Sequence, residues 1–483
     1  MAGTFKKWIT AITATSLLFS VGGLTACEKD DKAITAYDIA VQHGFVGTEE
    51  QWLASLKGAT GEDGKDFSIW EIYRQSGYEG SFVDFLKELG VTYNLQEDND
   101  TQMLAKNTSS VVSICCGFQK ATQRLVSMDF WGKPQYENVT KVSGSEGSGV
   151  IWRLEENDTT ASAYIVTNYH VVYQNATIND TPNGISDYIY VYPYGALEGF
   201  STGDANGDGY LDDGAEMGDT LGNGIKATFV GGAMDYDIAV LKVENSEYLK
   251  KTEVSAVELG ASNEAILGEK SYVIGNSNGQ GISITGGLIS VLSERIYILS
   301  PDGQNRRLDF RVMRTDAAIN HGNSGGALFD AKGKLLGITN AKSGADDVDN
   351  MGYALPIDMV KAVVNNILDN NGYVRLARLG VVTTIQSSNS YLTADGQIRT
   401  KEEFLVTKVE EGHVATQRLK FGDVLLSGTL NGETVEFEQR YLFQEQLLKV
   451  RKGDTITYRV KRESETVDVP ITFDKDEYFV DYK

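Results

Sequence analysis

Three short segments of this chain carry residue types that together could break a peptide bond. Ser324 sits between small and glycine residues after an apolar stretch. His170 lies in the β-type run 166–172, and Asp237 opens the apolar run 237–243. A serine hydroxyl is a weak nucleophile at neutral pH, but a neighbouring neutral imidazole can take its proton as the new bond forms. The three residue types therefore predict a nucleophile, a general base and a carboxylate that orients the base.

The glycine-rich turn around the serine supplies a second element of this chemistry. We expect the backbone amides of Gly322, Asn323 and Ser324 to form an oxyanion hole, which donates to the negative charge that develops on a substrate oxygen. Removing one such donor in related chemistry costs roughly 10²–10³ in rate. A lone glycine-rich turn is more often only a turn, so the prediction depends on all three segments, which occur in the order His, Asp, Ser.

The choice of base is narrow because the chain contains only four histidines. His43 lies in an N-terminal helical repeat and His413 in a C-terminal segment. His321 is on the same turn as Ser324, which constrains its ring too much to reach that hydroxyl easily. His170 is the remaining candidate.

These segments resemble the HtrA/Deg branch of the trypsin-like serine proteases. The matching stretches are residues 167–172, 237–243, 274–277, 285–290, 315–326 and 352–356. The resemblance extends over residues 108–483 and implies two six-stranded β-barrels with the triad in the cleft between them, followed by a PDZ domain. It also implies that His170 is the general base, Asp237 its orienting partner and Ser324 the nucleophile.

Two positions near the serine depart from common family patterns. A proline is usual where this chain has His321, which affects the shape of the oxyanion turn. In relatives that cleave after Arg or Lys, an acidic residue lies six places before the serine, whereas this chain has Ala318 followed by Ile319. Because burying an unpaired cation is costly, we expect cleavage after small or medium aliphatic residues.

Composition limits the classes of partner. The chain has 483 residues, 41% of them hydrophobic, which is enough for three or more domains with real cores. A formal net charge of −23 without a long Lys/Arg cluster argues against nucleic acid as a partner. Cys115 and Cys116 are adjacent on an apolar run without metal-type spacing, so we expect buried packing rather than a disulfide. The predicted reaction requires no cofactor.

The first residues read as a targeting segment. Lys6 and Lys7 precede a short apolar run, and residues 24–27 resemble a bacterial lipobox that ends in Cys27. This predicts a signal peptide over 1–26, lipidation of Cys27, and a chain anchored in the bacterial cell membrane that faces outside the cytoplasm. The alternatives are an uncleaved membrane anchor and a chance apolar stretch, and the run is short for a transmembrane helix.

Further segments complete the expected organisation. Residues 34–92 contain an internal repeat whose copies each read as two short helices, with Thr48 or Ser81 capping the second helix of each copy. Residues 93–107 read as a polar linker, 108–372 as a protease domain of short β-runs closed by a helix, and 373–483 as a PDZ domain. The fold class is therefore mainly β, a trypsin-like double β-barrel plus a PDZ domain, preceded by small helical repeats.

An acidic insertion between Gly195 and Gly224 contains a candidate calcium loop. Its oxygen-bearing residues have the spacing of such loops, with a glycine at the sixth place: Asp204, Asn206, Asp208, Tyr210 and Asp212. The twelfth place holds Ala215 rather than glutamate. A structural Ca²⁺ is one interpretation, and a solvated acidic hairpin tip is the other.

The C-terminal segment adds an expectation about peptide binding. PDZ domains capture peptide C-termini by strand addition, with backbone amides that hold the carboxylate. The loop ending at Leu379 and Gly380 would be that cradle. The alternative is a lid that packs on the protease without binding peptide.

The combined prediction is a membrane-anchored serine endopeptidase that cleaves exported proteins through an acyl-enzyme. The family resemblance implies unfolded or damaged protein substrates, and many relatives form homo-oligomers. The rival hypothesis is a catalytically silent binding protein that uses the PDZ domain and the repeats as adhesion modules. The intact set of three residues and the glycine-rich turn favour the enzyme.

Overall fold

The computed structural model separates two compact units, Met1–Glu97 and Asp98–Lys483. It describes residues 41, 46, 48, 51, 99–342 and 351–482. The signal peptide 1–26, the lipidation site Cys27 and most of the repeats at 34–92 therefore lie outside the described residues. In the first unit, the Thr48 N–H donates to the side chain of Gln51 at 2.8 Å and the Gln51 N–H donates to the Thr48 hydroxyl at 3.3 Å. This reciprocal pair has the geometry of a capping box, and the helical repeats stay a prediction.

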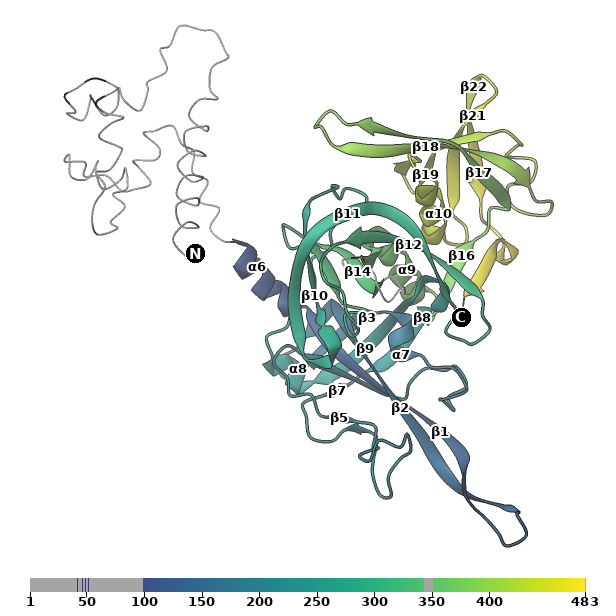
Figure 1. The fold of residues 1–483 in the computed structure, drawn as a ribbon. Coiled ribbons are helices and arrows are strands. Elements are labelled where there is room, and N and C mark those ends of the chain that lie inside the picture. Colours follow the sequence, from purple (N-terminus) through teal and green to yellow (C-terminus); the bar gives the residue numbers. More distant parts are fainter. Residues whose placement is uncertain are drawn as a thin grey trace, which may run out of the picture. The chain divides into compact units, whose positions relative to one another are not determined.

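The first half of the protease region is an antiparallel sheet in the order β7-β4-β1-β2-β3-β9-β8 (Figure 1). The strands are β1 Val111–Met128, β2 Pro134–Glu156, β3 Ala161–Thr167, β4 Tyr188–Pro193, β7 Ile225–Lys226, β8 Thr228–Ala233 and β9 Ile238–Ser246. Within the described residues the two edge strands do not pair, because β7 is only two residues long. The prediction of a closed, six-stranded barrel is therefore wrong in its strand number and hydrogen-bonded closure for this half, which is a seven-stranded sheet whose edge strand β7 still contacts β9.

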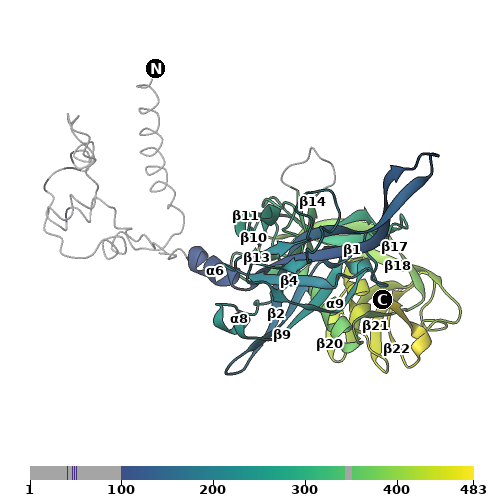
Figure 2. The same ribbon diagram turned by 90° about the horizontal axis from the view of Figure 1, so that it is seen from below.

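The second half forms the predicted closed, six-stranded barrel, in the order β10-β11-β12-β15-β14-β13. Its strands are β10 Lys270–Asn276, β11 Ile282–Leu299, β12 Arg307–Thr315, β13 Ala327–Asp330, β14 Leu335–Lys342 and β15 Gly352–Pro356. Several strands in the two halves are much longer than the short β-runs that the sequence suggested, with 23 residues in β2 and 18 each in β1 and β11. The distal part of β1 and β2 projects from the body as a hairpin (Figure 2).

Between residues 99 and 482, the described part of the chain contains five α-helices: α6 Asn99–Thr108, α7 Tyr169–Val172, α8 Glu247–Lys251, α9 Ile357–Asp369 and α10 Arg440–Lys449. Helix α6 corrects the interpretation of residues 93–107 as a linker. Leu104 packs against the main core, and the Asn107 amide donates to the carbonyl of Gly333 at 2.9 Å. Docking on the barrel thus overrides a composition that is polar over most of this segment. None of the described helices has the length and apolar character that a membrane crossing requires.

Helix α9 closes the barrel region, as the spacing of its apolar residues predicted. Its buried face belongs to a core that both halves share, and that core also includes Leu448 of α10. The helix ends where the Gly372 N–H donates to the Ile367 carbonyl at 2.9 Å, with φ +97° at Gly372. The Gly372 carbonyl accepts from Gly232 of β8 at 3.0 Å. A Cβ on Gly231 would lie 2.1 Å from that carbonyl oxygen, so the two backbones cross in contact.

Residues after Gly372 remain in the same compact unit as the barrel region. β16 Val374–Ala377 pairs with β23 Phe479–Tyr482. A second sheet has the order β17-β18-β19-β21-β22, and β20 also pairs with β19. Its strands are β17 Val381–Leu392, β18 Ile398–Val409, β19 Val424–Leu430, β20 Glu433–Glu436, β21 Thr455–Arg462 and β22 Glu465–Thr472. This sheet and α10 enclose a separate aromatic-rich core, and β17 lies at the sheet edge.

The two remaining cysteines are buried and unpaired in β1, as predicted. Cys116 belongs to the core of the first half. Burial raises the pKa of the Cys115 thiol to about 12, with a smaller contribution from nearby Glu198. Both side chains thus serve as small apolar packing groups.

Candidate active site

The histidine and the aspartate meet because their strands pair. Residues of β3 and β9 are in antiparallel register up to Thr167 opposite Ala239, which places the residues just beyond each strand side by side. His170 lies on the one-turn helix α7 and not in a β-run, because β3 ends at Thr167. Asp237 precedes β9 in a left-handed conformation with φ +49°.

The aspartate carboxylate holds both the backbone and the ring of the histidine. Asp237 Oδ2 lies 2.7 Å from His170 Nδ1, and Asp237 Oδ1 accepts the His170 backbone N–H at 2.9 Å. The Asp237 side chain is 5% exposed, whereas the His170 side chain is 36% exposed. This arrangement fixes the ring and leaves its Nε2 side accessible to a reacting group.

Two asparagines that the sequence analysis missed complete this contact. Asn340 Nδ2 donates to Asp237 Oδ2 at 2.6 Å, and Asn168 Nδ2 donates to the Asp237 backbone carbonyl at 2.9 Å. Both asparagines are buried. Asn168, two residues before the histidine, could have been suspected from its position, but Asn340 lies 103 residues from Asp237 and no local pattern points to it.

The pKa of His170 is raised above its ordinary value. Burial of the imidazole opposes its charged form, but the charge of Asp237 and the hydrogen bond to its carboxylate outweigh that effect. The imidazolium is therefore favoured next to this carboxylate, which suits a group that must accept a proton during the reaction.

Ser324 lies on the turn between β12 and β13, close to the same residues. Its Oγ donates to the backbone carbonyl of Asn340 at 2.6 Å. Among the described residues, Ser324 makes no hydrogen bond to His170. The three predicted catalytic residues are thus brought to one place, with the serine hydroxyl held by a carbonyl rather than by the base.

The glycine-rich turn presents two free amides. The N–H groups of Gly322 and Ser324 donate to no acceptor in the part of the chain that the structure describes, whereas the Asn323 N–H donates to the Asn320 carbonyl at 3.1 Å. The expectation that Asn323 also contributes an oxyanion donor is therefore wrong, because its amide is already bound. Gly322 has φ +85°, and a Cβ there would lie 2.0 Å from the Asn276 carbonyl oxygen.

Ser148 of β2 ties this turn to both halves of the protease region. Its hydroxyl donates to the Gly322 carbonyl at 2.7 Å and accepts the Asn276 N–H at 2.8 Å. Its backbone N–H donates to the Ser324 carbonyl at 2.8 Å. Ser148 therefore holds the turn through the carbonyls of Gly322 and Ser324 and leaves the amides of these two residues free. Nothing in the sequence around Ser148 marks this role.

The acidic insertion is organised by its own carboxylates. Asp204 Oδ1 accepts the Gly207 N–H at 2.7 Å, and the Asn206 amide donates to Asp212 Oδ1 at 2.6 Å. Arg124 donates to Asp208 Oδ2 at 2.9 Å and lies 4.8 Å over the Tyr210 ring. Within the described residues, no group of three or more His, Cys, Asp or Glu is arranged to hold a metal ion. Calcium binding at this loop stays a prediction.

A second concave site lies between the barrel and the C-terminal sheet, with a volume of about 780 Å³. Val381, Thr383 and Ile385 of the edge strand β17 line one side, and α10 lines another. The N–H groups of Leu379 and Gly380 at its end have no acceptor among the described residues.

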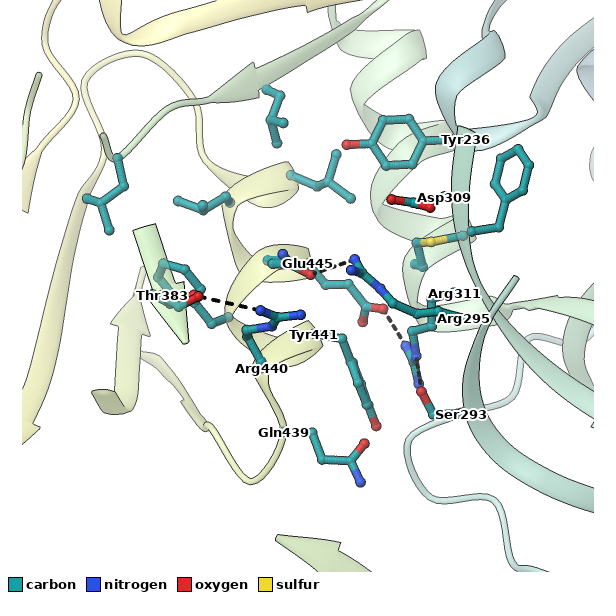
Figure 3. Close-up of a pocket in the computed structure, with 18 of the residues that line it drawn as sticks. Tyr236, Ser293, Arg295, Asp309, Arg311, Thr383, Gln439, Arg440, Tyr441 and Glu445 are labelled. Carbon is teal, nitrogen blue, oxygen red and sulfur yellow. Dashed lines mark hydrogen bonds and ion pairs between the residues drawn. The ribbon is translucent and has the colours of Figure 1, made fainter. Parts of the chain in front are cut away.

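Charged side chains cross this groove (Figure 3). Arg440 donates to the Thr383 carbonyl at 3.5 Å. Arg311 of the barrel forms an ion pair with Glu445 of α10, lies 3.4 Å over the Tyr441 ring, and donates to Ser293 at 3.2 Å. Burial raises the pKa of Glu445, although the charge of Arg311 opposes this shift.

Comparisons with known proteins bear on this site. A family model described as a trypsin-like peptidase domain matches residues 147–338, which contain His170, Asp237 and Ser324. The serine protease Do-like HtrA of Lactococcus lactis subsp. cremoris is 28% identical over 80% of this chain and 85% of its own length. An HtrA-like serine protease of Staphylococcus aureus is 30% identical over 49% of this chain and 30% of its own length. A solved structure of the HtrA-type protease AlgW with a decapeptide is 24% identical, covers 77% of this chain and 97% of its own, and has a TM-score of 0.46.

Proposed function

We propose that this chain is a serine endopeptidase whose reaction is carried by Ser324, His170 and Asp237, and the match of residues 147–338 to a trypsin-like peptidase domain and the similarity to HtrA proteases support this. The observation that supports this most directly is the buried Asp237 carboxylate bonded to both the backbone and the ring of His170, beside a serine on a turn with two free amides. That combination can generate a nucleophile, store a proton and stabilise an oxyanion at one place.

The reaction begins with a change at the serine. Rotation about the Cα–Cβ bond of Ser324 takes its hydroxyl from the Asn340 carbonyl toward His170 Nε2. Oγ then attacks the substrate carbonyl, its proton moves to Nε2, and the amides of Gly322 and Ser324 bind the oxyanion. Asp237 stabilises the imidazolium, which gives the proton to the leaving amine. Water, activated by the same imidazole, hydrolyses the acyl-enzyme and restores the serine.

Removal of the serine hydroxyl tests this assignment. Ser324→Ala should lower peptide-bond cleavage by roughly 10⁴–10⁶ and abolish labelling by a fluorophosphonate probe, and His170→Ala should be about as damaging because the triad acts as a unit. Ser388→Ala, at an exposed position in β17, is the matched control and should keep full labelling. Labelling of the Ser324→Ala protein would exclude Ser324 as the nucleophile, and absence of labelling in the parent protein would favour the silent binding protein.

We propose that the groove beside β17 binds peptide C-termini as a PDZ domain does. The edge position of β17, the free amides of Leu379 and Gly380 and the facing helix α10 support this function. A strand added to β17 needs the Thr383 carbonyl, which Arg440 now occupies. A peptide must therefore displace Arg440, and the lid hypothesis predicts that no peptide does so.

Paired peptides distinguish the two hypotheses in the Ser324→Ala protein, which does not digest them. A peptide with a free carboxylate should bind more tightly than the same peptide with a C-terminal amide, because only the carboxylate meets the two amides. Arg440→Ala should tighten binding, and Ile385→Lys on the groove-facing side of β17 should weaken it. Equal affinities for the carboxylate and the amide would support the lid.

We further propose that Cys27 carries a lipid that anchors the enzyme at the outer side of the bacterial cell membrane, where it cleaves exported, unfolded proteins. The basic and apolar N-terminal residues before Cys27 support this location. When cells are grown with radioactive palmitate, the wild-type chain should become labelled and the Cys27→Ala chain should not. The Cys27→Ala chain should also be lost from the membrane fraction. Faster cleavage of an unfolded protein than of the same protein in its folded form would support the substrate class.

A further inference from the structure

The hairpin of β1 and β2 carries two highly exposed aromatic side chains at its tip. β1 is buried over residues 111–118, and beyond that Ala121 still bonds to Asp180 and Arg124 to Asp208, after which the strand continues to Met128. Both views show this projection (Figures 1 and 2). Phe130 is 94% exposed and Trp131 is 86% exposed, and none of the hairpin residues beyond Phe118 and before Val142 belongs to a hydrophobic core.

The turn at the tip is rigidly built and does not itself require aromatic residues. Asp129 Oδ1 accepts the Trp131 N–H at 2.9 Å and the Lys133 N–H at 2.8 Å, and the Gly132 N–H donates to the Asp129 carbonyl at 3.0 Å. Gly132 takes the left-handed conformation, with φ +77°. Aspartate and glycine set this backbone, so the two corner positions between them could hold any polar residue.

Aromatic residues occupy those corners instead. The rings of Phe130 and Trp131 contact edge to face, with centroids 5.6 Å apart and planes at 89°. Behind them, Leu125 and Tyr136 form an exposed cross-strand pair on the face opposite Arg124. The tip thus presents a small convex apolar surface, and its contact with water is energetically unfavourable.

The charge of the hairpin differs from that of the chain. Residues 119–141 contain Lys120, Arg124, Lys133 and Lys141 against only Asp129 and Glu137, in a chain whose formal net charge is −23. Arg124 is bonded to Glu137 and Asp208, whereas the side chain of Lys133, two residues after Trp131 in the sequence, has no partner among the described residues. A cation beside an exposed tryptophan suits a negatively charged lipid surface, where the ring enters the interface and the ammonium stays among the headgroups.

We propose that the tip of this hairpin, residues 128–136, inserts into the headgroup region of an anionic lipid bilayer. A convex tip of this size buries far less area than a stable protein interface needs, but two aromatic rings are enough for interfacial binding when a second attachment holds the chain nearby. The proposal does not rest on peptidase activity, and the second attachment is the N-terminal segment, either through its apolar run or through a lipid on Cys27.

Vesicle binding by the full-length chain tests the proposal. The Cys27→Ser background removes any attached lipid, and the apolar N-terminal run is the same in every variant, so differences report on the tip. Phe130→Ser/Trp131→Ser should lower the partition coefficient on vesicles that contain phosphatidylglycerol by roughly tenfold or more. Lys133→Glu should lower it by roughly five- to tenfold on these vesicles and little on pure phosphatidylcholine.

The matched control removes two other exposed apolar side chains, Leu221 and Phe421, which are 85% and 77% exposed. Leu221→Ser/Phe421→Ser should bind vesicles like the parent protein. Trp131→Phe should remove a fluorescence signal that brominated lipids quench in the parent. All of these variants should melt with the parent and keep its peptidase activity in solution, because none of the altered side chains is buried.

Three results would overturn the proposal. One is vesicle binding by Phe130→Ser/Trp131→Ser that equals that of the parent. Another is an equal loss in the Leu221/Phe421 control, which would mean that any exposed apolar side chain contributes. The third is that the tip substitutions change only self-association, measured by sedimentation velocity without vesicles, and not vesicle binding. The tip would then be a contact between copies of this chain.

Discussion

Replacement of Asn340 by leucine should separate the electrostatics of the catalytic pair from its packing. Asn340 is buried, and its amide is one of three donors to the Asp237 carboxylate, beside the backbone N–H and Nδ1 of His170. Leucine has a similar shape and no donor. The Asn340 backbone carbonyl, which accepts the Ser324 hydroxyl, is unaffected by the substitution.

The expected loss of stability follows from one hydrogen bond to a buried charge. Such a bond contributes about 1.5–3 kcal/mol, and its loss leaves part of the carboxylate unsatisfied. We expect the free energy of unfolding of Asn340→Leu to fall by about that amount. Urea unfolding should be measured in the Ser324→Ala background, so that self-digestion does not distort the transition.

The same substitution should move the pH dependence of catalysis. Asp237 already raises the pKa of His170, and a carboxylate with fewer donors attracts the imidazolium proton more strongly. The base must be neutral to accept the serine proton, so kcat/KM rises as pH rises through the pKa of His170. We therefore expect the acidic limb of the kcat/KM profile above the ordinary histidine range in the parent protein, and at still higher pH in Asn340→Leu.

The contribution of His170 to folding stability changes with pH in the opposite direction to kcat/KM. A histidine whose pKa is raised on folding stabilises the folded state fully below its unfolded pKa, and this contribution is lost as pH rises through the folded pKa. The interaction that stabilises the fold in acid is thus the one that holds the base protonated and inactive there.

Asn366→Leu is the matched control for this experiment. Asn366 is also fully buried, and its amide donates to the Leu448 and Arg375 carbonyls, away from the catalytic residues. This variant should lose stability without moving the acidic limb. If Asn340→Leu also lost only stability and kept the parent profile, the argument that Asn340 shares the charge of Asp237 with His170 would be refuted.

Three further predictions concern specificity, calcium and the groove. Mass spectrometry of digested casein should find cleavage mainly after Val, Ala or Leu, because Ala318 offers no charge to a buried cation, and a majority of Arg or Lys sites would contradict this. If the loop at 204–212 binds Ca²⁺, calcium at about a hundred times Kd should stabilise the folded state by about 2.7 kcal/mol. Magnesium should stabilise it less, and Asp204→Ala/Asp208→Ala should show no calcium effect. Equal melting shifts with both ions would mean that the loop is acidic and that the ions only screen its charge. Glu445→Ala should lower the free energy of unfolding by about 3–5 kcal/mol because it leaves Arg311 buried and unpaired, whereas Arg311→Met/Glu445→Leu should be nearly neutral. Urea unfolding measures both variants. Equal losses in the two would show that the ion pair itself stabilises the contact.

The sequence pointed to the proposed catalytic residues because each lies in a short segment with its own local signal. The order of those segments, the apolar run after Asp237 and the glycines around Ser324 are readable without the fold. The residues that hold the site together were not predictable in the same way. Asn340 and Ser148 act through tertiary contacts across many residues, and their own neighbours in the sequence look like ordinary strand residues.

The fold was predictable where periodicity decides it and not where packing does. The apolar spacing of residues 357–368 predicted helix α9, and the family resemblance implied the closed second barrel. The open first sheet depends on how few residues of β7 reach its edge, which no pattern encodes. Helix α6 has a weakly amphipathic, polar sequence and depends on its contacts with the barrel. The projecting hairpin follows from pairing that continues beyond the core, which local propensity does not limit.

The crossing of the Gly231 and Gly372 backbones decides how this chain can be divided in the laboratory. A shortened protein that ends with α9 at Asp369 would remove the carbonyl that accepts from Gly232, and β8 would lose a partner directly upstream of the turn that carries Asp237. It would also uncover Ile367 and the neighbouring apolar surface that Val374 and Leu448 now share with it. A cut after Tyr373 keeps the first of these contacts but not the second. An active fragment of the barrel region alone therefore needs polar replacements on α9, and a recombinant boundary chosen from the linear sequence would give an insoluble or poorly active product.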